Sequence, residues 1–137
     1  MPEIIITIQA LPPKQLNPNV GYGPEGKRRL KNDWQETVAW AIRAQLGPCI
    51  WQPMARAKLT IEHIIDGTND RRMDDQNIQA MHKGTVDVLK PVSKVAPWGM
   101  GIIRDDNPTR LTIAPYIQTI DPKRAPMTIL RIEEDRP

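Results

Sequence analysis

The 137-residue sequence contains no phenylalanine, one cysteine and only two histidines. A single cysteine, Cys49, excludes an internal disulfide and a multi-cysteine zinc site, and we interpret it as a small, semi-buried apolar residue. No run of 18 apolar residues is present, so no membrane span is expected. The start, Met1 to Glu3, is acidic rather than basic, which is not typical of a signal peptide. A soluble, cytoplasmic protein is therefore expected.

Without phenylalanine, the core must consist of Ile, Leu, Val and Met together with the four tryptophans. The length predicts a single domain spanning residues 1–137. Strands are predicted at 3–10, 55–66, 111–113 and 127–132, the first covered on both faces and the last two in a terminal hairpin or meander. Helices are predicted from about Glu25 to Leu46 and from the acidic motif at Asp74 to about Lys90. These elements predict an α/β fold of the α+β-like kind, a small mixed sheet packed with two main helices.

The segment Arg71-Arg72-Met73-Asp74-Asp75-Gln76-Asn77 and the helix after it organise the chain. At about 100° per residue, one polar face carries Gln76, Ala80, Lys83 and Asp87 within about 60°. The opposite stripe is apolar and is expected to pack on the core: Ile78, Met81, Thr85, Val88 and Leu89. An alternative interpretation is an acidic N-cap at Asp74 followed by a Lys83–Asp87 surface pair.

A second acidic pair, Asp105-Asp106, lies downstream in a short polar turn. Carboxylate and amide oxygens are the ligands that Mg²⁺ prefers, and arginines bind phosphodiesters. The proposed acidic cluster comprises Asp70, Asp74, Asp75, Asp105 and Asp106, and Glu62 would be a further ligand if it pointed there. The rest of the chain is then strongly basic, which is typical of a metal-dependent nuclease. A random mixed surface is equally compatible with the net charge of +3.

Basic side chains also crowd the first turns of the helix predicted at 25–46, where they could follow a DNA backbone: Lys27, Arg28, Arg29 and Lys31. The alternative is an ordinary solvated face. The loop at 15–24 is rich in turn residues and is expected either to reach over an active site or to act as a plain connector. His63 and His82 have no metal-ligand spacing, and we interpret both as surface or packing residues.

Together these motifs resemble the RusA-type Holliday-junction resolvases, small phage and bacterial endonucleases. The family pattern is an arginine-rich run, D-x-D-N, a helix with a lysine, and an Asp-Asp pair in a turn. Here Arg71-Arg72 precedes Asp74-Asp75-Gln76-Asn77, Lys83 follows Asn77 by six residues, and Asp105-Asp106-Asn107-Pro108 matches the terminal pair. Leu11-Pro12-Pro13-Lys14 is similar to the family's N-terminal loop. The resemblance covers most of the chain.

The resemblance implies a homodimer that resolves four-way DNA junctions by paired, Mg²⁺- or Mn²⁺-dependent nicks in DNA recombination and repair. It implies that Asp74 and Asp106 are the main metal ligands, with Asp105 beside them, and that Lys83 contacts the scissile phosphate. Asn77 would position a ligand or cap the helix, with Asp75 and Asp87 in support. Phosphate contacts would come from the basic residues: Lys14, Lys27, Arg28, Arg29, Lys31, Arg71 and Arg72.

One position departs from the family pattern, because Gln76 stands where the second aspartate of D-x-D-N is expected. An amide oxygen can bind a hard cation but carries no charge, so metal binding should be weaker. The adjacent Asp75 is a possible substitute ligand. The alternatives are therefore a junction-binding protein on the same scaffold that cuts poorly or not at all, and a general nuclease with no junction preference.

Overall fold

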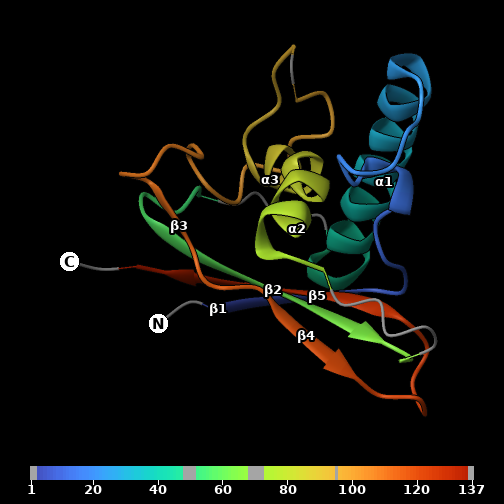
Figure 1. The fold of residues 1–137 in the computed structure, drawn as a ribbon. Helices are drawn as coiled ribbons and strands as arrows, with labels where there is room; N and C mark the ends of the chain where they lie inside the picture. Colours follow the sequence, from blue (N-terminus) through green and yellow to red (C-terminus); the bar gives the residue numbers. More distant parts are fainter. Residues whose placement is uncertain (1–2, 48–51, 68–72, 95, 136–137) are drawn as a thin grey trace.

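The computed structural model describes residues 3–47, 52–67, 73–94 and 96–135. Within these ranges the chain forms a mixed five-stranded sheet and three α-helices (Figure 1), which confirms the predicted fold class. The strands are β1 (Glu3–Ile8), β2 (Ala57–Ile65), β3 (Leu111–Ile113), β4 (Ile117–Ile120) and β5 (Met127–Glu134). The helices are α1 (Pro24–Leu46), α2 (Asp75–Met81) and α3 (Lys83–Leu89), with a short 3₁₀ turn, η1 (Lys14–Leu16).

The strand order is β1-β5-β2-β3, and β4 also pairs with β2 further along its length. β5 is antiparallel to both β1 and β2, whereas β3 and β4 run parallel to β2. The predicted terminal hairpin is therefore wrong, because β5 lies between β1 and β2 and pairs with neither β3 nor β4. Parallel strands need a long crossover, and the crossover from β2 to β3 contains α2 and α3, which carry most of the predicted site.

The three helices all lie on one face of the sheet (Figure 1). Alternation along β1 follows from this arrangement: Ile4, Ile6 and Ile8 are buried, whereas Ile5 is 47% exposed. The expectation that β1 is covered on both faces is therefore wrong. The composition of β1, with β-branched residues at nearly every position, led to the prediction that both of its faces are buried. Burial depends instead on which face of the sheet the helices cover.

The core lies between this face of the sheet and the helices, and it joins isoleucines and leucines of the strands to Trp34, Val38 and Ile42 of α1. α1 begins and ends close to the predicted bounds. Pro24 occupies its first turn, where a missing N–H costs nothing. Gly47 ends the helix at a positive φ of 73°. None of the helices in the described ranges is long and apolar enough to cross a membrane.

The helix predicted to run to about Lys90 is interrupted at His82, which separates α2 from α3. The backbone N–H of His82 still donates to the carbonyl groups of Ile78 and Gln79, but the residue has φ −98° and ψ 9°. The His82 side chain is 0% exposed and takes part in a buried hydrogen-bonded network. The predicted apolar stripe is confirmed: Ile78, Met81, Thr85, Val88 and Leu89 are all buried.

Candidate metal and nucleic-acid site

Residues 100–103 form hydrogen bonds with the C-terminal end of α3 and so position the second acidic pair. The N–H groups of Ile102 and Ile103 donate to the Leu89 carbonyl at 2.8 and 3.0 Å, and the Met100 N–H donates to the Val88 carbonyl at 2.7 Å. The last carbonyls of a helix have no partner within the helix. Residues 100–103 belong to the connector between α3 and the Asp105-Asp106 turn, and their N–H groups satisfy these carbonyls. Ile102 and Ile103 are buried as a result. The turn that follows, with Asp105 and Asp106, is thus attached to the end of α3.

Two glycines permit this close approach. A Cβ atom at Gly99 would lie 2.5 Å from the carbonyl oxygen of Lys90, which is backbone and cannot move aside. Gly101 has a φ of +70°, a conformation that glycine adopts at no steric cost. The return of the connector onto α3 therefore depends on glycine at both positions.

A chain of ion pairs links α1, the C-terminal end of α3 and the Asp105-Asp106 turn. Lys90 Nζ lies 3.4 Å from Asp87 Oδ1 and 3.6 Å from Asp106 Oδ2, and Lys31 Nζ of α1 lies 3.6 Å from Asp87 Oδ2. Partial burial opposes the charged form of Lys90, but the carboxylates of Asp106 and Asp87 outweigh it and raise the Lys90 pKa. Asp106 is thus held beside α3 by a charged residue that the sequence analysis did not single out.

Asp105 and Asp106 differ in their surroundings. Asp105 Oδ1 accepts the backbone N–H of Asp106 at 2.8 Å, and Asp105 Oδ2 accepts the Asn107 side-chain amide at 3.0 Å. These hydrogen bonds, first of all the one from the Asp106 backbone, lower the pKa of the Asp105 carboxyl. Both Asp105 oxygens thus stabilise the turn, whereas the Asp106 carboxylate extends to Lys90.

The first acidic motif forms the start of α2. Asp74 is the N-cap in an extended conformation, and its backbone carbonyl accepts the N–H groups of Asn77 and Ile78. Its exposed side chain makes no capping hydrogen bond, so the acidic-cap interpretation describes its position but not its carboxylate. Asp75 and Gln76 are also exposed, and Asn77 is half-buried.

The entry to α2 is attached to β4. The Gln118 side chain accepts the Met73 N–H at 2.8 Å and donates to the Met73 carbonyl at 2.7 Å. Tyr116 lies just before β4, and burial, with a further contribution from the Asp75 charge, raises the Tyr116 pKa to about 12. β4 was not predicted from the sequence, yet it positions the residue directly before Asp74.

The remaining predicted residues occupy three places. Lys83 is the exposed first residue of α3. Next to it, Gly84 packs against α1, where an added Cβ would lie 3.1 Å from Lys31 Cγ. The basic residues predicted to contact DNA lie on η1 and the first turns of α1: Lys14, Lys27, Arg28, Arg29 and Lys31. Arg71, Arg72 and Asp70 lie outside the described residues.

The structure brings Asp87 and Asp106 to one lysine, but it does not gather all the predicted acids. Among the residues that it describes, no group of three or more His, Cys, Asp or Glu side chains is arranged to hold a metal ion. Glu62 accepts a hydrogen bond from Thr119 Oγ1 at 2.5 Å and so is engaged with β4. The oxygen donors that are present fit a hard cation by type, since Mg²⁺ usually takes one or two carboxylates and keeps several waters.

The two histidines form a buried pair that sequence reasoning missed. Their Nε2 atoms are 2.7 Å apart, His82 Nδ1 lies 2.8 Å from Thr85 Oγ1, and that hydroxyl accepts the Trp34 indole N–H at 2.8 Å. Burial lowers the pKa of His63 to about 4. Burial, and then the neighbouring His63, lower the pKa of His82 well below its ordinary value. Both are packing residues, as expected, and neither is at the surface.

No signal in the sequence pairs these histidines, because they lie 19 positions apart on different elements. The one available clue was that His82 follows Met81 beside the apolar stripe of the predicted helix. Comparison with known proteins adds no identification: no protein-family model matches the chain, and no match was found among curated proteins.

Proposed function

We propose that this protein is a metal-dependent endodeoxyribonuclease that resolves four-way DNA junctions. The observation that carries the proposal is the attachment of the Asp105-Asp106 turn to α3, with Lys90 between Asp87 and Asp106. The second acidic pair is thus attached to the C-terminal end of the α2–α3 segment, whose N-terminal end carries Asp74. The order of these motifs also resembles that of the RusA-type resolvases.

In this proposal Asp106 is the ligand from the second pair, because both oxygens of Asp105 are used within the turn. Asp74 is the ligand from the first motif, since its exposed carboxylate makes no capping hydrogen bond. Gln76 and Asp75 provide further oxygen atoms beside it. The cation, Mg²⁺ or Mn²⁺, would supply an activated water and neutralise charge on the phosphate.

The chain's own cations bind the substrate. Lys83 is exposed at the start of α3 and would contact the scissile phosphate. Arg28 and Arg29, exposed in the first turns of α1, would contact the backbone beside it. Two symmetric nicks require two related sites, so we propose that the active form is a homodimer. We also propose a cytoplasmic location, where a branched-DNA substrate would be available to the enzyme.

The test is a nicking assay on a synthetic four-way junction with Mg²⁺, Mn²⁺ or EDTA, and with linear duplex at the same salt concentration as the control. Paired nicks that need a metal and occur only on the junction are expected. Asp106→Asn should reduce the rate by at least about 100-fold, because a lost ligand costs more than a lost supporting contact. Asp33→Asn, the same change at an exposed residue of α1, should cut at the wild-type rate.

Metal-independent nicking, or equal rates in both aspartate variants, would refute the assignment of Asp106. Equal cutting of linear duplex would instead indicate a general nuclease. The second candidate function, a junction binder that cuts poorly, is motivated by Gln76. It predicts tight junction binding in EDTA and no nicks with any metal. Gln76→Asp should then increase metal affinity or cutting, and no change in either would contradict that role for Gln76.

A further inference from the structure

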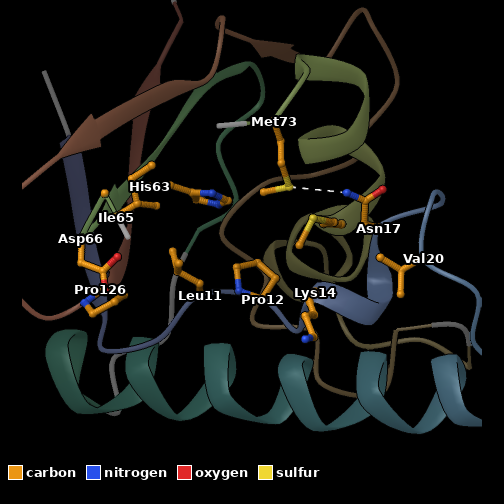
Figure 2. A pocket seen from close by; sticks show the side chains of 12 residues that line it. Leu11, Pro12, Lys14, Asn17, Val20, His63, Ile65, Asp66, Met73 and Pro126 are labelled. Carbon is orange, nitrogen blue, oxygen red and sulfur yellow. Dashed lines mark hydrogen bonds between the residues drawn. The ribbon is translucent and has the colours of Figure 1, made fainter. Parts of the chain in front are cut away.

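A cavity of about 390 Å³ lies between the N-terminal segment, the end of β2 and the entry to α2. Figure 2 shows Leu11 and Pro12 on one side, Met73 on another, and the imidazole of His63 projecting from β2 toward the space between them. A volume near the low end of the usual range of about 300–1,000 Å³ suits one small molecule or one group of a larger ligand.

The hydrogen-bonded network determines which polar group His63 offers. The Trp34 indole can only donate, so Thr85 Oγ1 accepts from it. The Thr85 hydroxyl proton then has one partner within reach, His82 Nδ1. In the tautomer order that gives the Thr85 hydroxyl proton an acceptor, His82 carries its proton on Nε2 and donates to His63 Nε2. The neutral His63 is left with its proton on Nδ1.

His63 Nδ1–H is a donor without an acceptor. It is the one buried side-chain nitrogen or oxygen without a hydrogen-bond partner among the residues that the structure describes. A buried unsatisfied donor costs free energy, and an acceptor on a ligand would remove that cost. The opposite tautomer order would leave two groups without partners, the Thr85 hydroxyl proton and the lone pair of His63 Nδ1.

The other lining residues select against an anion. Lys14 and Asp66 bring one positive and one negative charge to the lining, so the lining has no excess of positive charge to hold an anion. Most of the remaining lining is apolar, and two methionines, Met73 and Met81, contribute thioethers, which pack favourably against aromatic rings. The cavity therefore favours a neutral aromatic group with a hydrogen-bond acceptor on its edge over a phosphate.

We propose that this cavity binds a single unpaired nucleobase, with His63 Nδ1–H donating to an acceptor on the base. Nucleobases are flat and neutral, and all carry ring or carbonyl acceptors. Met73, a lining residue, directly precedes Asp74 and is held by Gln118, so a bound base would lie next to the start of the acidic motif. Naming branched DNA as the source of the base rests on the proposed function.

The first experiment needs no DNA. Long-range ¹H–¹⁵N spectra of the imidazoles, with adenosine, guanosine, cytidine or thymidine added to about 10 mM, should show saturable shifts at His63 Nδ1. Ribose 5-phosphate, which lacks a base, should produce none. Val20→Trp fills the cavity and should abolish the shifts. Val92→Trp is the matched control at a 70% exposed position and should preserve them.

The free protein itself tests the tautomers, which keeps the proposal falsifiable if Val20→Trp fails to fold. A proton on His63 Nε2 rather than Nδ1, or no saturable shift with any nucleoside, would overturn the proposal. Equal shifts with ribose 5-phosphate would overturn it too, because the cavity would then bind the sugar phosphate.

The second experiment identifies the source of the base. A four-way junction with an abasic site at the branch point should bind about tenfold more weakly than the intact junction in EDTA, since it lacks the base that would fill the cavity. Val20→Trp should bind both junctions equally. If nucleosides bind but the intact and abasic junctions bind equally, the cavity binds a base as proposed, and its ligand is a free nucleoside. A junction that is bound and cut, with no response to nucleosides or to the abasic site, overturns the cavity proposal and leaves the proposed function intact.

Discussion

Acidification is expected to destabilise this protein through its buried histidine pair. The sequence holds two histidines, and both belong to this pair, so all imidazole titration occurs there. Burial lowers the pKa of His63 to about 4 and that of His82 well below its ordinary value. Below pH 6.5 the unfolded chain binds protons that the folded protein does not, so stability is lost as the pH falls toward the folded pKa.

The magnitude follows from the His63 pKa. One pKa unit corresponds to about 1.4 kcal/mol, so a histidine with a folded pKa of about 4 loses roughly 2 kcal/mol of stability between pH 7 and pH 5. The pKa of His82 is also lowered, by burial and by the neighbouring His63, so His82 adds to this loss. With an m-value of about 2 kcal/mol per molar urea, the denaturation midpoint should fall by at least about 1 M.

The assay is urea denaturation followed by tryptophan fluorescence at pH 7, 6 and 5. The double variant His63→Gln/His82→Gln is the control and should have a much flatter profile over this range. If the double variant does not fold, NMR titration of the two wild-type imidazoles measures the same quantity. A folded-state midpoint near pH 6.5 for either histidine, or equal urea midpoints at pH 7 and pH 5, would refute the reasoning.

Three further substitutions test the packing and charges around the site. Gly84→Leu should lower the free energy of unfolding by about 1–3 kcal/mol, because α3 closely approaches α1 there; Gly84→Ala is the milder control, and equal stability of the two variants in urea would contradict this contact. Gln118→Leu should cost about 1–3 kcal/mol by removing both hydrogen bonds to the Met73 backbone, and an unchanged Met73 amide resonance would show that the hydrogen bonds are absent in solution. Lys90→Met removes the positive charge beside Asp106 and should increase Mn²⁺ affinity about three- to fivefold by calorimetry, in line with the modest strength of exposed ion pairs; weaker Mn²⁺ binding would indicate that Lys90 is needed to hold Asp106 in place.

Much of the local structure could be predicted from the sequence because it depends on neighbouring residues. Pro24 and Gly47 mark the ends of α1 by their backbone preferences. The helical period identified the buried stripe from Ile78 to Leu89 correctly, although the helix is interrupted. The turn at Asp105 was likewise predictable from its run of Asp, Asn and Pro.

The arrangement of the site could not be predicted in the same way, since it depends on contacts between distant segments. The connector reaches the carbonyls of Val88 and Leu89 only because α3 ends there with unsatisfied acceptors. Lys90 joins Asp87 to Asp106 as a consequence. The spacing of the acidic residues along the chain predicted that they could lie close together. It carried no information on which basic side chain lies between them.

The sequence by itself determined the periodic elements, the mixed fold class and the polar face of the second helical segment, because these follow from the preferences of neighbouring residues. The tertiary structure alone decided the insertion of β5 between β1 and β2, the break at His82 and the cavity beside His63. Each of these depends on side chains far apart in the sequence satisfying one another's hydrogen bonds or filling one another's space. Local sequence patterns do not reveal such pairings, because they join residues that become neighbours only in the folded chain.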